Sequence, residues 1–146
     1  MNLTHLVKRA LGSVSQKSPS SQDVATVLTV LNSEEFVVWS EMQLRDQRHS
    51  IVVLRRFDAL LPEAKTSERA AALLHDIGKN VSGLGFVARV AATVIGPKGQ
   101  RFSEYHNHES LGADLLRSIS DPRTVALVGG TAIDDVSRLL QAADNI

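Results

Sequence analysis

Cysteine is absent from this 146-residue chain. Its absence excludes disulfide bonds, thiolate metal sites and cysteine nucleophiles, so any metal ion would have to be held by histidine, carboxylate groups and water. The chain also lacks a block of like charge, because 16 Lys and Arg residues balance 16 Asp and Glu residues. This balance argues against the broad basic surface of a non-specific nucleic-acid-binding protein.

Long apolar runs are missing as well. No segment of the sequence is apolar enough to span a bilayer. The amino terminus mixes Asn2, Thr4, Lys8 and Arg9 with its apolar residues, unlike the continuous apolar region of a signal peptide. We therefore expect no membrane partner and a cytoplasmic location.

Apolar residues recur with helical spacing along most of the chain, which predicts an all-α fold. The length suits one domain with a substantial core, and we divide it into a peripheral N-terminal helix and connector (1–20) and a helical domain (21–146). We expect Ser20 or Ser21 to cap the next helix, and Ser33 to cap a helix that continues to Leu60 with a break near Arg45.

Two further helices are expected near the carboxyl end. Asp121 and Pro122 should start a short helix that Gly129 and Gly130 end. Thr131 should then cap the last helix, with Asp134 in its first turn.

The segment from Ala70 to Lys79, AAALLHDIGK, contains the chain's most informative pattern. It predicts a helix of small and apolar residues that ends by presenting His75 and Asp76 side by side, since Gly78 permits the left-handed conformation common at helix ends. Their tips can converge on one ion, and Lys79 can reach a phosphate bound there. The alternative is that His-Asp is a chance dipeptide or a surface hydrogen bond.

The string HDIGK resembles the signature of the HD-domain metal-dependent phosphohydrolases. That family has a single-domain helical bundle whose ligands follow the order His, His-Asp and a distant Asp. The resemblance covers roughly Ser33 to the carboxyl end and implies that His49, His75, Asp76 and Asp144 bind a metal ion. Helical spacing with Val52, Val53 and Phe57 predicts that His49 lies on a buried stripe, where the alternative is a core histidine bonded to a carbonyl.

A second histidine pair lies in the segment from Phe102 to Ala113, which resembles the second histidine motif of HD domains. By this resemblance, His108 binds a second metal ion, a bridging water or the substrate phosphate; His106 does the same or is an exposed neighbour. Members with two metals usually carry a further histidine, but the matching stretch 126–131 has none. That difference argues against a fully occupied two-metal site.

The resemblance implies a metal-dependent phosphohydrolase that cleaves a phosphate ester of a nucleotide-like small molecule through metal-activated water. Asp76, Lys79 and His108 would act in catalysis. Histidine and carboxylate ligands suit Mn, Fe, Zn, Ni, Co or Mg, and both phosphomonoesters and phosphodiesters remain open as substrates. The alternative is an HD-fold module that binds metal or nucleotide and regulates a partner. A purely structural bundle would have to leave several polar residues facing the core without a ligand, at a cost of several kcal/mol.

Overall fold

The computed structural model describes residues 17–77 and 115–145, and these residues form helices without any strand. The all-α prediction is confirmed. The helices are α2 (Ser21–Val30), α3 (Ser33–Ser40), α4 (Leu44–Leu60), α5 (Thr66–Leu74), α9 (Pro122–Val128) and α10 (Asp135–Asp144).

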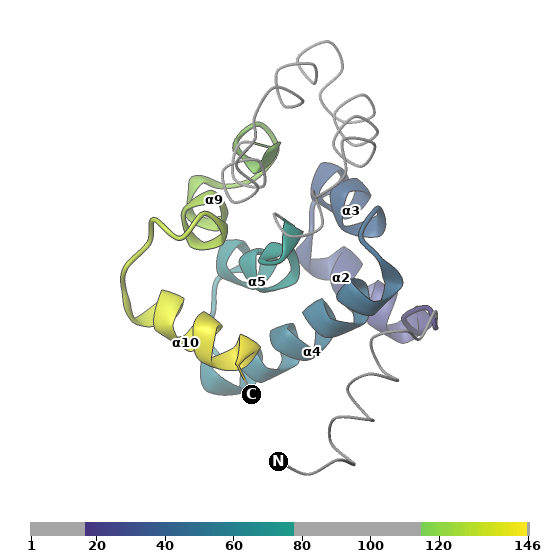
Figure 1. The fold of residues 1–146 in the computed structure, drawn as a ribbon, viewed down its shortest axis with the longest axis horizontal. Helices are drawn as coiled ribbons and strands as arrows, with labels where there is room; N and C mark the ends of the chain where they lie inside the picture. The colour runs from purple at the N-terminus through teal and green to yellow at the C-terminus, as the bar shows by residue number, and fades with distance from the viewer. Residues whose placement is uncertain (1–16, 78–114, 146) are drawn as a thin grey trace, which may run out of the picture.

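Helix α5 lies at the centre of the described bundle (Figure 1). It packs against α4 on one side and α9 on another, and it also contacts α2. The helix can be central because Ala70, Ala71, Ala72, Leu73 and Leu74 are all buried, and a helix that is apolar all round is stable only when surrounded. The last helix, α10, packs on α4.

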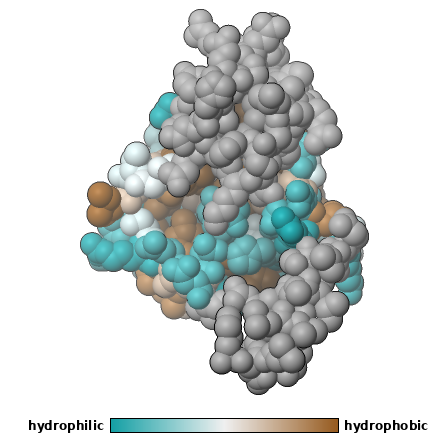
Figure 2. Space-filling model, in the orientation of Figure 1, coloured by the Kyte–Doolittle hydropathy of each residue, from teal (hydrophilic) through white to brown (hydrophobic). Residues whose placement is uncertain are grey.

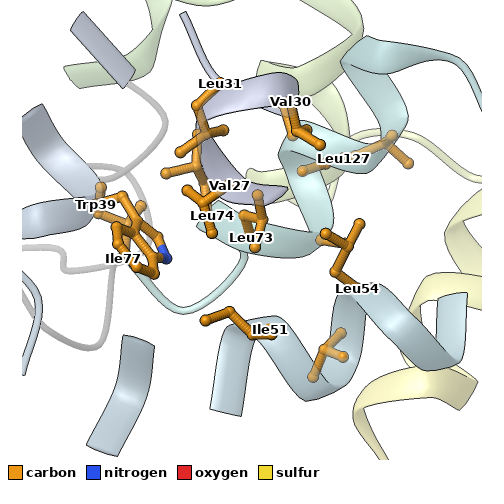
Figure 3. Close-up of a cluster of buried hydrophobic side chains, with 14 of the residues drawn as sticks. Val27, Val30, Leu31, Trp39, Ile51, Leu54, Leu73, Leu74, Ile77 and Leu127 are labelled. Atoms are coloured by element: carbon orange, nitrogen blue, oxygen red, sulfur yellow. The ribbon is translucent and has the colours of Figure 1, made fainter. Parts of the chain in front are cut away.

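The core takes side chains from all six described helices, and Figure 3 labels some of those that come from α2, α3, α4, α5 and α9. Trp39 of α3 lies in it, and its indole Nε1–H donates a hydrogen bond to Ser50 Oγ of α4 at 2.9 Å. Ser50 in turn donates to the carbonyl of Gln47 at 2.7 Å. The buried indole nitrogen is therefore satisfied by a hydroxyl that is itself fixed in orientation.

We expect Ser50→Ala to lower the free energy of unfolding by about 1–3 kcal/mol, because the buried indole N–H would lose its acceptor. Urea denaturation measures the change. Ser40→Ala is the control: its exposed hydroxyl donates to the carbonyl of Val37 and accepts nothing from a buried donor, so the loss should stay within about 0.5 kcal/mol. Equal losses in the two variants would contradict this role for Ser50.

The predicted helical stretch from Ser33 to Leu60 is divided into α3 and α4 at residues 41–43, which confirms the predicted break near Arg45. The buried Gln47 side chain explains the break, because its Nε2 donates to the carbonyls of Ser40 and Met42, both at 3.0 Å. Asn32, rather than Ser33, caps α3: its Oδ1 accepts from the backbone N–H of Glu35 at 2.8 Å.

The cap of the last helix is also different from the prediction. Asp134, not Thr131, is the N-cap of α10, and its Oδ1 accepts from the Ser137 backbone N–H at 3.0 Å. Ser20, by contrast, caps α2 as predicted, and Asp121 and Pro122 start α9 as predicted. Gly129 is the C-cap of α9 and Gly130 follows with φ +75°, so the predicted end of this helix is also correct.

Arg123 of α9 joins the starts of α5 and α10. Its Nη1 donates to Asp134 Oδ2 at 2.7 Å and its Nη2 to Glu68 Oε2 at 3.3 Å. Glu68 is buried, and its other oxygen accepts from the backbone N–H of Lys65 at the start of α5. The hydrogen bond from Arg123 holds the pKa of Asp134 below its ordinary value. The Arg123 guanidinium thus links the amino-terminal ends of α5 and α10, and candidate metal ligands lie at the carboxyl-terminal ends of the same two helices.

The described surface visible in Figure 2 is mostly hydrophilic, with scattered apolar residues. Among residues 17–77 and 115–145, the exposed large apolar side chains come from separate parts of the chain: Leu28, Val52, Leu60 and Ile133. Apolar residues exposed singly are ordinary in globular proteins. Among the described helices, none has the length and apolar character needed to cross a bilayer.

Candidate metal centre

Two histidines and two aspartates converge from three separate parts of the bundle. His49 lies in α4, His75 and Asp76 directly follow α5, and Asp144 is the last residue of α10. One ligand atom from each side chain lies within 4.8 Å of the other three. Residues that the sequence separates by up to 95 positions therefore meet at one point.

Asp144 is the carboxylate that contacts both imidazoles. Its Oδ1 lies 2.9 Å from His49 Nε2 and 3.1 Å from His75 Nε2. Asp76 Oδ2 lies 3.2 Å from His75 Nε2 and 4.0 Å from His49 Nε2. Both histidines thus present the same ring nitrogen to the two carboxylates.

The backbone determines which nitrogen of His75 faces the cluster. His75 Nδ1 lies 2.7 Å from the carbonyl oxygen of Ala72, and a carbonyl only accepts, so Nδ1 carries a proton. In the neutral ring Nε2 then offers a lone pair, and it can donate to Asp144 only if the ring is a cation. The cluster therefore requires either an additional proton on His75 or a cation among the four side chains.

Helix orientation adds negative potential at the same point. Both α5 and α10 direct their carboxyl-terminal ends at the cluster, and neither has a basic residue in its last turn. A helix carboxyl end carries a partial negative charge, and an aspartate there is unfavourable without a compensating cation. Two such ends and two carboxylates make this a place where positive charge is strongly stabilised.

The proton affinities show the same preference. Burial by itself lowers the pKa of His75, but the hydrogen bond and charge of Asp76, the Ala72 carbonyl and the charge of Asp144 together raise it above its ordinary value of 6.5. Burial raises the pKa of Asp144, yet the hydrogen bond from His49 and the charge of His75 bring it below its ordinary value. Both shifts have the same origin: the carboxylates favour positive charge on His75, and the two histidines favour negative charge on Asp144.

A model of the protein family described as "HD domain" matches residues 46–146, which is more than half of the chain and includes all four side chains. The chain belongs to the HD domain family. This result confirms the resemblance drawn from the HDIGK string and agrees with the all-α fold. Searches among curated proteins and among solved structures found no match.

The four side chains of this HD domain suit a divalent metal ion, which HD domains bind. Two ligands about 2.0–2.2 Å from one ion and at right angles to each other are roughly 3 Å apart. Three of the separations in the cluster, 2.9, 3.1 and 3.2 Å, lie close to that value. Imidazole nitrogen and carboxylate oxygen are also ligands that divalent transition metals accept.

Exposure of the four side chains is graded, so the cluster opens on one side. The side chains of His75 and Asp76 are 12% and 13% exposed, whereas that of Asp144 is 30% and that of His49 is 40% exposed. The prediction that His49 lies on a buried stripe is therefore wrong, although Val53 and Phe57 of the same helix are buried.

In the metal-free HD domain, we expect stability to fall as pH rises. The folded-state pKa of His75 is above 6.5, so its protonated form stabilises the fold fully below pH 6.5, and this contribution is lost as pH rises through the folded pKa. Urea denaturation with a chelator between about pH 6 and 9 measures it. In His75→Gln the free energy of unfolding should depend less on pH. If it fell with rising pH as steeply as in the wild type, the pH dependence would not come from His75.

Several predicted site residues lie outside the described residues. These are Gly78, Lys79, His106 and His108. The predicted roles of Lys79, His106 and His108 therefore stay predictions.

The structure also shows two groups near the cluster that the sequence reading missed. One is the Ala72 carbonyl that orients His75, a backbone group that carries no signal of its own. The other is Arg56 of α4, whose Nη1 donates to the Ala143 carbonyl at 3.3 Å, next to Asp144. Its spacing of seven residues from His49, two helical turns, was the available signal.

Proposed function

We propose that this HD domain is a metal-dependent phosphohydrolase that cleaves a phosphate ester of a nucleotide-like small molecule. His49, His75, Asp76 and Asp144 are the proposed metal ligands. The observation that carries the proposal is the convergence of their ligand atoms within 4.8 Å at a point where two helix carboxyl ends meet. Membership of a family that is generally hydrolytic supports it.

A bound divalent ion lowers the pKa of a water molecule and offsets negative charge on phosphoryl oxygens. The protein's own groups would prepare this chemistry. The Ala72 carbonyl keeps His75 in the tautomer that presents Nε2. Asp76, which is mostly buried, is proposed to accept a hydrogen bond from the attacking water in addition to binding the ion. The more exposed side of the cluster, at His49, is the proposed entry for the phosphate.

Lys79 and His108 are proposed to contact the substrate phosphate, and His106 to assist or to lie beside it. We expect Lys79→Ala to lower hydrolytic turnover while leaving metal content and melting temperature nearly unchanged, because a structural ion pair at a helix end contributes only about 0–1 kcal/mol. Lys65→Ala, which removes an exposed lysine at the other end of α5, is the control. A large loss of stability with turnover intact would contradict the role of Lys79.

The test of function is a panel of nucleotides and generic phosphomonoesters and phosphodiesters, assayed with Mn²⁺, Mg²⁺ and Ni²⁺ and the protein purified without a histidine tag. We expect hydrolysis of at least one phosphate ester that depends on added metal and is lost in Asp76→Asn. Hydrolysis that survives in Asp76→Asn would come from a contaminant and would count against the proposal. Metal binding without hydrolysis of any substrate would favour the second candidate.

That second candidate is an HD-fold module that binds metal or a nucleotide and regulates a partner. The stretch 126–131, where two-metal members usually carry a histidine, forms the end of α9 and the following turn. The Ala126 carbonyl accepts hydrogen bonds from the backbone N–H groups of Thr131 and Ala132, at 3.0 and 3.1 Å, so this stretch closes the helix, and it contains no histidine or carboxylate. A less complete site of this kind suits binding without turnover.

A further inference from the structure

The carboxyl end of α10 has a local electrostatic problem. Asp144 places a negative charge at the negative end of the helix dipole, and the last carbonyls of any helix lack partners within it. The last turn of α10 has no basic residue of its own.

Arg56 supplies a hydrogen-bond donor and a positive charge to the carboxyl end of α10. Its Nη1 donates to the Ala143 carbonyl at 3.3 Å, and its guanidinium brings a positive charge to the helix end. Arg56 lies on α4 seven residues after His49, so the two side chains leave the same face of that helix two turns apart. The helix that carries one candidate ligand therefore also binds the backbone beside another.

Apolar packing alone leaves the last turn less well defined. Leu140 and Ala143 are the buried residues of α10, and Ala143 is the last of them. A methyl group fixes the distance between two helices but constrains rotation and sliding only weakly, whereas a hydrogen bond to a specific carbonyl constrains both. The position of Asp144 Oδ1 depends directly on the rotation of α10.

We propose that Arg56 is a positioning residue for the metal centre: by binding the Ala143 carbonyl it fixes the last turn of α10 so that Asp144 meets His49 and His75. This inference rests on the proposed metal site. Arg56 itself does not touch the metal ion or the substrate in this account. Its loss should act on metal affinity through the geometry of Asp144.

The test compares Arg56→Gln with Arg55→Gln. The two arginines are neighbours on α4, but Arg55 pairs with Asp23 of α2, a helix that carries none of the four candidate ligands. Isothermal titration with Mn²⁺ and Ni²⁺ should show affinity about tenfold weaker or more in Arg56→Gln, the effect typical of groups that orient metal ligands. Arg55→Gln should bind as the wild type does. Equal affinity in Arg56→Gln and the wild type would overturn the proposal.

Hydrogen exchange in the metal-free protein gives a readout that does not depend on the metal. The amide of Asn145, which bonds the Gln141 carbonyl at 3.1 Å, should exchange faster in Arg56→Gln than in Arg55→Gln. Arg56→Lys, which keeps the charge and one donor, should give intermediate exchange and metal affinity, and it replaces Arg56→Gln if that variant does not fold. If the wild type bound no metal, the proposed function would fail, while faster exchange in Arg56→Gln would still support the positioning of Asp144. If the Asn145 amide exchanged equally fast in Arg56→Gln and Arg55→Gln, the positioning role of Arg56 would be overturned.

Discussion

Asp144→Asn is expected to weaken metal binding by more than about 100-fold, beyond the 10–100-fold typical of groups that only orient ligands. Asp144 is the carboxylate whose Oδ1 contacts both imidazoles, at 2.9 and 3.1 Å. Asparagine keeps the size of the side chain but removes the negative charge, and its amide oxygen is a poorer ligand. Isothermal titration with Mn²⁺ measures the affinity, and any metal-dependent phosphoester hydrolysis should fall with it.

The control for this variant is Asp135→Asn. It makes the same chemical change at the start of the same helix, where the side chain is 93% exposed and pairs with Arg138. We expect Asp135→Asn to bind metal with the affinity of the wild type. If Asp144→Asn bound metal as tightly as Asp135→Asn does, Asp144 would be an ordinary carboxylate at a helix end and the proposed ligand set would be wrong.

Removal of the metal ion is expected to loosen α10 before the rest of the bundle. A metal at 100 times its dissociation constant stabilises the state that binds it by about 2.7 kcal/mol, a factor of about 100 in the opening equilibrium. Asp144 is the ligand that links α10 to the cluster, so this stabilisation should appear first in α10. Hydrogen exchange with and without a chelator should show selective loss of protection at Leu139, Leu140 and the three residues that follow.

Amides of Val53 and Leu54 in the buried part of α4 provide the internal control, because their protection comes from the apolar core. They should change much less when the metal ion is removed. In Asp144→Asn, α10 should exchange at the metal-free rate even when metal is supplied. If α10 were equally protected in the wild type with metal, the wild type with chelator and Asp144→Asn with metal, the apolar packing of Leu140 and Ala143 alone would hold the helix in place.

The parts of this structure that the sequence predicted are those that depend on local pattern or on a short motif. The buried, alanine-rich α5 follows from its run of small and apolar residues, and Asp121 with Pro122 marks the start of α9. The family motif and its order of ligands selected the four side chains that the structure brings together. Spacing alone did not reveal that His49 is partly exposed.

The parts that the sequence did not explain or predicted wrongly depend on hydrogen bonds between residues distant in sequence or between a side chain and the backbone. Gln47 separates α3 from α4 by binding two carbonyls, which hydrophobic periodicity does not reveal. Asp134 caps α10 while accepting a hydrogen bond from Arg123, whereas the Thr131 hydroxyl donates to the Ala126 carbonyl at 3.4 Å. The role of Arg56 depends on the helix that its guanidinium meets, which only the folded arrangement shows.

Anomalous diffraction from crystals grown with Mn²⁺ tests the central claim most directly. The account predicts an anomalous peak at the cluster, with His49 Nε2, His75 Nε2 and a carboxylate oxygen from each of Asp76 and Asp144 at about 2.0–2.3 Å. His75 Nδ1 should remain bonded to the Ala72 carbonyl. A Mn²⁺ ion bound elsewhere, or a cluster that remains closed by hydrogen bonds at saturating Mn²⁺, would contradict the account.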